Sequence, residues 1–220
     1  TLYAALSRLD SATLNMMTVE DPIEYDLDGV GQTQVNARIE MTFARALRAI
    51  LRQDPDVIMI GEIRDLETAQ IAVQASLTGH LVLATLHTND AASAVTRLID
   101  MGIEPFLLAS TLLGVLAQRL VRLTCKECRK SHPPEQEVRE AFNGDSVPEI
   151  IYTAVGCAAC NWTGYLGRSG IYELITVDDD IRQMIHDAAA EQHIREHASQ
   201  RGMTSRAGIS RRRYGITSTA

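Results

Sequence analysis

The chain of 220 residues is poor in lysine, in aromatic residues and in long hydrophobic runs. Of its 21 basic residues only Lys126 and Lys130 are lysine, and aromatic residues make up 5% of the sequence. Few aromatic side chains and a net charge of −7 argue against a nucleic-acid-binding surface that relies on base stacking and general positive charge. Only the run Arg211 to Arg213 favours nucleic acid, so we expect no nucleic-acid partner.

No apolar run reaches the ~20 residues that a membrane span needs, and polar residues interrupt the longest, near 105–116. We therefore expect a soluble or peripheral protein. The first residues already read as an amphipathic helix without an initiator methionine or a helix cap, which predicts a fragment of a longer protein.

With 220 residues and 45% hydrophobic content, the chain can bury the core of one full domain and of a second, smaller part. The apolar run Val57 to Ile60 is typical of a strand buried on both faces of a parallel sheet. Helices are expected at 2–9, 42–51, 66–77, 91–101, 105–118 and 178–198, and strands at 15–19, 57–60, 81–86 and 170–175, with 20–36 as a polar turn-rich segment. This alternation predicts an α/β fold, a three-layer sheet joined by crossover helices.

Composition divides the chain into three parts. Residues 1–122 form the predicted α/β core, 123–165 are charged and carry all the cysteines, and 166–220 form a small, mostly helical C-terminal part. The cysteines fall in two CxxC hooks, which suit one tetrahedral zinc ion: Cys125, Cys128, Cys157 and Cys160. Two disulfides or a redox-active pair remain the alternatives.

Titratable side chains follow three predicted strands. Glu62 comes after the buried strand and a glycine, Glu20 and Glu24 follow the first strand, and His87 follows the third. Because ligands bind beyond the carboxyl ends of parallel strands, these groups predict one reactive crevice. Four apolar residues followed by an acid is the Walker B pattern of nucleotide hydrolases, although acids are also common after buried strands. His80, at a strand start, fits a structural role as well.

Three segments resemble the Asp box, Walker B and His box of the secretion ATPases: Thr18 to Tyr25, Arg52 to Asp65, and Thr78 to Asn89. Gly31 to Asn36 and the four cysteines resemble the type II secretion ATPases in particular. The pilus-assembly extension ATPases are the close alternative, and the retraction ATPases, which lack the cysteines, are disfavoured.

The resemblance implies a RecA-like ATPase core of the P-loop NTPase class with a zinc-binding subdomain. It implies a homo-hexamer that uses ATP and Mg²⁺ at the cytoplasmic face of the inner membrane, associates with the membrane through secretion-platform proteins and drives pseudopilus assembly and protein export across the outer membrane. Glu62 would be the Walker B carboxylate, Glu20 and Glu24 would place metal and water, and His80 and His87 would position the γ-phosphate. Residues that lie at the edge of the nucleotide site or between subunits would be Asp21, Arg48, Arg52, Arg64 and Arg97. Arg48 and Arg52, four residues apart, also fit an exposed helix face paired with acids.

One required element is missing from the sequence. A P-loop needs G-x-x-x-x-G-K-[ST], and no lysine precedes Lys126. We therefore expect the phosphate loop to lie just upstream in a longer protein and the 220 residues alone to be inactive. A non-catalytic, zinc-stapled docking module is the alternative from a different class.

Overall fold

The computed structural model describes residues 1–141, 147–201 and 203, which form two compact units. Unit 1 comprises residues 1–89, 93–113 and 177–191, and unit 2 comprises residues 90–92, 114–176 and the described residues from 192 onward. The three-part division at residues 122 and 165 stays a prediction. The tail with Arg211 to Arg213 lies outside the described residues.

The elements follow this order along the chain: α1 (Leu2–Leu6), β1 (Met16–Glu20), β2 (Val30–Gln34), η1 (Ala37–Ile39), α2 (Phe43–Ile50), β3 (Val57–Ile60), α3 (Leu66–Leu77), β4 (Leu81–Ala84), α4 (Ala91–Asp100), α5 (Pro105–Thr111), β5 (Gly114–Thr124), β6 (Lys130–His132), α6 (Gln136–Ala141), β7 (Ile151–Thr153), η2 (Ala158–Cys160), β8 (Tyr165–Thr176), α7 (Asp179–His186) and α8 (Glu191–Gln200).

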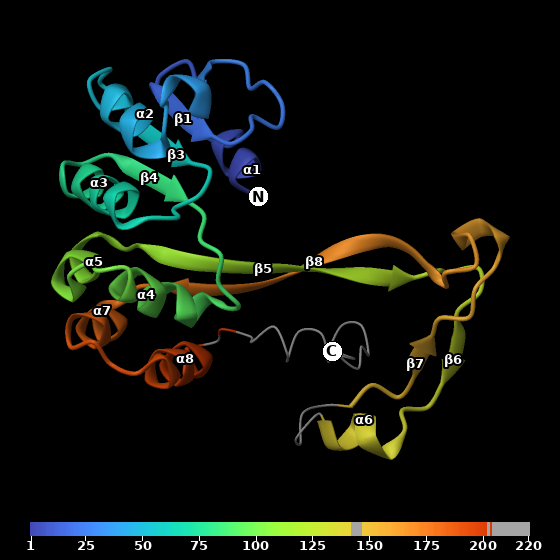
Figure 1. The fold of residues 1–220 in the computed structure, drawn as a ribbon. Coiled ribbons are helices and arrows are strands. Elements are labelled where there is room, and N and C mark those ends of the chain that lie inside the picture. Colours follow the sequence, from blue (N-terminus) through green and yellow to red (C-terminus); the bar gives the residue numbers. More distant parts are fainter. Residues whose placement is uncertain (142–146, 202, 204–220) are drawn as a thin grey trace. The chain divides into compact units, whose positions relative to one another are not determined.

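Unit 1 contains a parallel sheet with the strand order β2-β1-β3-β4 (Figure 1). All four residues of β3 are buried, as the continuous apolar run predicts for a central strand. Because successive residues of a strand face opposite sides, Met16, Val57 and Met59 share one face and pack with Leu6 of α1. Helices α2 and α3 contact the sheet and each other, and Figure 1 shows them on the side away from α1. The predicted three-layer α/β fold is confirmed.

Capping residues place the starts of α2 and α3. The Thr42 side chain accepts a 3.2 Å hydrogen bond from the backbone N–H of Arg45, and Asp65 accepts one of 2.8 Å from Thr68. Such caps satisfy backbone donors that the first helical turn leaves free. Asp65 therefore begins α3 four residues after Gly61, close behind the end of β3.

Unit 2 is built on two antiparallel strand pairs. The long strands β5 and β8 pair from Gly114 with Thr176 to Thr124 with Tyr165, and β6 pairs with β7. One CxxC hook follows β5 and the other precedes β8. The β5–β8 pair therefore brings the two hooks together.

Several elements differ from those predicted. The segment 20–36 contains β2, which the polar composition of that segment concealed. The helix predicted at 105–118 ends at Thr111, because residues from Gly114 pair with β8 and this pairing overrides the helical propensity of Leu, Ala and Gln. The predicted buried strand 81–86 is β4, an edge strand with Leu81 37% exposed.

The single helix predicted at 178–198 is two helices, α7 and α8. Asp178 caps α7 as expected for an acidic helix start, accepting a 2.8 Å hydrogen bond from the Ile181 N–H. The break follows His186, where Ala188 adopts a left-handed backbone with φ of 50° that a helix cannot continue through.

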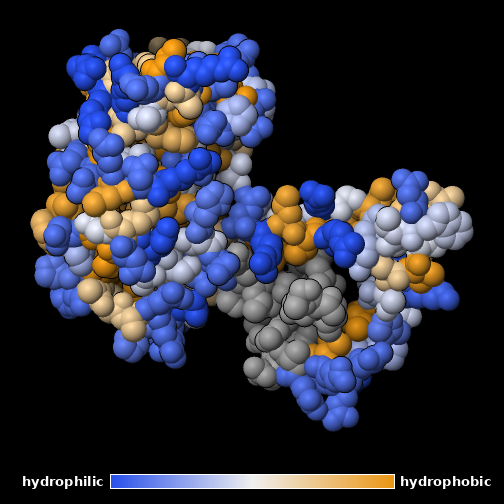
Figure 2. Space-filling view, viewed as in Figure 1, coloured by the Kyte–Doolittle hydropathy of each residue, from blue (hydrophilic) through white to orange (hydrophobic). Residues whose placement is uncertain are grey.

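Within the described residues, no helix combines the length and apolarity needed to cross a membrane. On the face seen in Figure 2, hydrophilic residues predominate and hydrophobic ones are interspersed among them. Large exposed hydrophobic side chains include Leu113, Leu174 and Trp162.

Candidate active site and metal centre

Glu62 lies at the carboxyl end of β3, where a glycine lets two strands approach closely. A side chain on Gly61 would place its Cβ 3.2 Å from the carbonyl oxygen of Val19. The Glu62 side chain is 13% exposed, and its two oxygens have different partners. Arg64 Nη2 lies 2.5 Å from Oε1, and His87 Nε2 lies 3.2 Å from Oε2. The structure therefore brings together Glu62, Arg64 and His87, three of the predicted site residues.

Arg64 dominates the electrostatics of Glu62. The hydrogen bond from Arg64 lowers the pKa of the Glu62 carboxyl below its ordinary value, against the opposing effect of burial, and contacts with Arg64 and His87 add to the lowering. The same contact raises the pKa of Arg64. Arg64 also lies 4.0 Å from Asp21. Glu62 is therefore a carboxylate at neutral pH, able to accept hydrogen bonds from water or to face a cation.

Glu20 is buried, with 3% exposure, at the end of β1. Its carboxylate accepts hydrogen bonds from the hydroxyls of Tyr3 and Thr18 and from the Gln32 amide, at 2.5 Å for Thr18 and 3.0 Å for Gln32. Burial raises the pKa of the Tyr3 hydroxyl, and the hydrogen bond to Glu20 raises it further. These three donors give Glu20 a fixed position at the end of β1, the strand that pairs with β3.

Tyr3 and Gln32, which both contact Glu20, are not predicted from the sequence. Tyr3 Oη also accepts a 3.1 Å hydrogen bond from the backbone N–H of Glu24, so it joins α1 to the segment after β1. The side chains of Glu24 and Asp21 are exposed. A polar residue in β2 could have suggested Gln32, but only once β2 itself had been recognised.

The structure does not bring His80 to this edge. His80 lies before β4, at the amino ends of the strands, and its Nδ1 lies 2.9 Å from the Ala75 carbonyl and 3.0 Å from the Thr78 hydroxyl. It thus closes the C-terminal end of α3, in agreement with the structural alternative.

The remaining predicted arginines are exposed on or after helices. Arg48 of α2 forms a 2.5 Å ion pair with Glu67 of α3, which agrees with the alternative of an exposed helix face paired with acids. Arg52 lies in the turn after α2, and Arg97 lies on α4. Their predicted contacts with nucleotide or a neighbouring subunit stay predictions.

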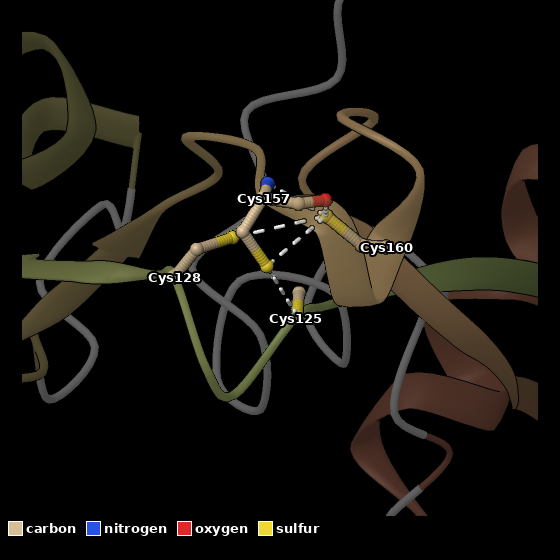
Figure 3. A group of neighbouring side chains, drawn as sticks. All are labelled: Cys125, Cys128, Cys157 and Cys160. Atoms are coloured by element: carbon tan, nitrogen blue, oxygen red, sulfur yellow. Dashed lines mark hydrogen bonds between the residues drawn. The ribbon is translucent and has the colours of Figure 1, made fainter.

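The four cysteines form one cluster in unit 2. In Figure 3 their side chains converge from the two hooks, and all four Sγ atoms lie within 4.8 Å of one another. Measured pairs are Cys125–Cys157 at 4.0 Å, Cys128–Cys160 at 3.9 Å and Cys157–Cys160 at 3.8 Å. A tetrahedral zinc ion with Zn–S bonds of about 2.3 Å has S–S edges of about 3.8 Å, so the cluster has the dimensions of a metal site.

Backbone amides and burial set the thiol chemistry of the cluster. Burial raises the pKa of Cys128 to about 11. At Cys160 burial acts in the same direction, but hydrogen bonds from the Cys157 and Gly164 N–H groups, 3.2 Å each, help to lower the pKa to about 6. These amides favour a thiolate, which is the form that binds metal. The Sγ separations exceed the ~2.05 Å of a disulfide bond, so the disulfide alternative does not describe this arrangement.

A family model described as type II/IV secretion system protein matches residues 1–220. The chain belongs to this family. It is 67% identical over 205 residues to the type II secretion system protein HxcR of Pseudomonas aeruginosa, covering 93% of this chain and 40% of that protein. It is 60% identical over 220 residues to the type II secretion system ATPase E of Vibrio cholerae, covering 99% and 44%. The resemblance inferred from the motifs is thereby confirmed, and the chain spans less than half the length of these relatives.

Solved structures with the same fold include a pilus motor and an ATPase. The pilus retraction motor PilT with bound ADP superimposes with a TM-score of 0.56 at 28% identity, covering 91% of this chain and 53% of that one. The ATPase DotB of Legionella pneumophila gives 0.58 at 21% identity, covering 93% and 54%, and shows the shared fold alone.

Proposed function

We propose that this chain is the catalytic part of an ATP-hydrolysing motor of type II secretion. The observation that carries the proposal is the ionised Glu62 at the tip of the buried strand β3, held by Arg64 and His87. Identity of 60% to a type II secretion ATPase E supports the same function.

In this proposal Glu62 acts on the attacking water. Its carboxylate accepts a hydrogen bond from the water and orients it toward the γ-phosphate, while Arg64 and His87 keep the carboxylate in place. Glu20, fixed by Tyr3 and Gln32, supports the neighbouring strand tip. Bound Mg²⁺ would neutralise phosphate charge, and the exposed acids Asp21 and Glu24 stand at this edge of the sheet as its candidate ligands.

The lysine-bearing phosphate loop is proposed to lie outside these 220 residues. The half-exposed edge strand β4 supports this, because a P-loop strand could pair along it. In the whole protein we propose six copies of the chain at the cytoplasmic face of the inner membrane, in contact with membrane proteins of the secretion system. These partners rest on the family resemblance.

We further propose that the cysteine cluster holds one zinc ion. Four thiolates close the coordination shell, which is typical of structural rather than catalytic zinc. The zinc would hold the two hooks together at the end of the β5–β8 pair. The second candidate function is a docking module without catalysis. It is favoured by the closed cysteine site, which has no open coordination position for chemistry and is distant from Glu62 in the sequence.

The substitution Glu62→Gln in the whole protein tests the catalytic proposal. We expect nucleotide binding to persist and turnover to fall by about 100-fold or more, because the neutral amide loses the ion pair with Arg64 and holds and polarises the attacking water less strongly than a carboxylate does. The matched control is Glu40→Gln, which removes an exposed acid paired at 3.9 Å with Arg45 and should leave turnover unchanged. Undiminished turnover in Glu62→Gln would remove Glu62 from this role.

The 220 residues alone should hydrolyse no ATP, because they contain no phosphate loop. Robust Mg²⁺-dependent turnover by them would contradict the proposal that catalysis requires this loop.

A further inference from the structure

Two arginines face each other directly across the β5–β8 pair. Arg122 of β5 is the register partner of Arg168 of β8. Directly opposite residues of an antiparallel pair project from the same face with Cβ atoms about 4.5–5.5 Å apart, and like charges at such positions destabilise the pairing. The arrangement has a cost in stability unless a negative charge lies between the two side chains.

The strands themselves do not provide that charge. The only acidic residue in β5 and β8 is Glu173, which is an odd number of positions from Arg168 and so projects from the opposite face. Glu173 is 6% exposed, and its carboxylate lies 3.4 Å from the Ala91 amide. Neither Arg122 nor Arg168 takes part in any of the ion pairs found among residues 1–141, 147–201 and 203.

Arg122 and Arg168 line a surface cavity of about 250 Å³ together with Thr163, Tyr165 and Gly167. The Arg122 guanidinium carbon stacks 4.0 Å above the centre of the Tyr165 ring, which holds the planar group by a cation–π contact. Stacking occupies a face of the guanidinium and leaves the N–H groups at its edge able to donate. A β-bulge after Arg122 locally shifts the register next to the cavity.

We propose that this cavity binds an oxyanion of the phosphate class, bridging Arg122 and Arg168. Each guanidinium presents paired N–H donors that match two oxygens of one anion, and a tetrahedral phosphate has oxygens for both forks at once. A carboxylate has only two oxygens and would satisfy one fork. The anion would remove the repulsion between the arginines and join the two strands beside the cysteine cluster. The site lies in unit 2 and does not depend on the proposed hydrolysis at Glu62.

Binding of inorganic phosphate by the purified 220-residue chain tests the proposal. Calorimetric titration at constant ionic strength, with sodium chloride replaced stepwise by sodium phosphate, should give saturable binding. Arg168→Gln should weaken the affinity at least about tenfold, because it removes a charge-assisted fork. Arg119→Gln is the matched control: it removes the same charge from β5 of the same strand pair, at a position that faces Ile171 instead of an arginine. Its affinity should equal that of the unmodified chain.

The source of the phosphate group is decided by a second arm. Vesicles of phosphatidylcholine containing phosphatidic acid present the same phosphate chemistry as a headgroup. Arg168-dependent co-sedimentation with these vesicles, without free phosphate binding, would identify a lipid headgroup as the ligand. Arg168-dependent binding of inorganic phosphate would identify a free anion.

Two results would overturn the proposal. One is the absence of saturable binding of both inorganic phosphate and the vesicles. The other is an equal loss of affinity in Arg168→Gln and Arg119→Gln, which would mean that the anion is attracted by positive charge in general and not by this cavity. If circular dichroism shows that Arg168→Gln does not fold, Arg122→Lys decides. It keeps the charge but lacks the fork, so we expect at least a severalfold loss of affinity. Unchanged affinity in Arg122→Lys would likewise overturn the proposal.

Discussion

At the scale of single residues, the candidate site depends on how each carboxylate is held. Glu62 is ionised because Arg64 stabilises the charged form, whereas Glu20 is buried and accepts hydrogen bonds from Tyr3 and Gln32. The sequence predicts Glu62 and His87 together because both follow strand ends, and it predicts Arg64 only through the family resemblance. It does not predict Tyr3 or Gln32, since their proximity to Glu20 depends on α1 packing against the sheet and on the register of β2.

The Arg64–Glu62 contact predicts a pH dependence of stability. The folded-state pKa of Glu62 lies below its ordinary value of 4.5, so its contribution is fully present above that value and is lost as the pH falls through the folded-state pKa. In Arg64→Gln the pKa of Glu62 should be lowered less than in the unmodified chain. We therefore expect the melting temperature of this variant to fall less as the pH is reduced. Thermal unfolding between about pH 3 and pH 7, the range in which carboxyl groups titrate, measures the pH dependence of the melting temperature. A carbon-13 titration over the same range follows the ionisation of Glu62. Arg45→Gln serves as control, and an unchanged Glu62 titration in Arg64→Gln would show that Arg64 is not the cause.

Removing the Tyr3 hydroxyl tests the support of Glu20. Tyr3→Phe leaves a buried carboxylate with one donor fewer, and we expect the free energy of unfolding to fall by about 1–2 kcal/mol. Urea unfolding followed by circular dichroism measures the change. Tyr25→Phe is the control, because the exposed Tyr25 contacts Tyr3 through its ring, edge-on at 4.6 Å. Equal effects of the two substitutions would mean that the hydroxyl of Tyr3 contributes nothing specific.

At the scale of elements, the sequence predicts those helices and strands whose ends are set by nearby capping and turn residues. Helix α3 occurs at the predicted residues 66–77, because Asp65 caps its start and the Thr78-Gly79 turn ends it. Residues 114–118 at the start of β5 are predicted as the end of a helix because they include good helix formers. Only the pairing partner β8, more than forty residues later, determines their conformation. Long-range pairing of this kind has no local signal in one sequence.

The cap of α3 gives a prediction for an element. Asp65→Ala removes the acceptor of the 2.8 Å hydrogen bond from Thr68 N–H, and we expect a loss of about 1 kcal/mol of stability. Asp65→Asn keeps an acceptor and should retain most of the stability. The urea midpoint of the two variants provides the comparison, and a loss of equal size in both would point to the charge of Asp65 instead of its capping bond.

At the scale of the whole molecule, the chain passes more than once between its two compact units. Residues 177–191 belong to the same compact unit as the parallel sheet although they are distant from it in sequence, and composition along the chain carries no signal of such an association. The two CxxC hooks are predictable from the sequence because the spacing of the cysteines within each hook is a local pattern.

Metal analysis of the purified chain should find one zinc per molecule. Removal of zinc with a strong chelator should increase hydrogen–deuterium exchange in the peptides around both hooks and leave that of β3 and α3 nearly unchanged, because those elements have their own buried core. Chains free of metal, with protected amides at the hooks, would contradict the zinc site. Cys128→Ser should bind zinc more weakly and serves as the matched variant.

The separation of the two hooks also bears on how this part of the protein can vary. In sequence, 28 residues, 129–156, separate Cys128 of the first hook from Cys157 of the second. The entropy lost on closing a flexible loop grows only with the logarithm of its length, about 0.6 kcal/mol for each doubling. Halving or doubling this segment would change the closure free energy by an amount that is small beside the binding energy of a structural zinc ion. Zinc bound by the four cysteines would thus let this segment accept insertions and deletions while the long strands that carry the hooks stay the same.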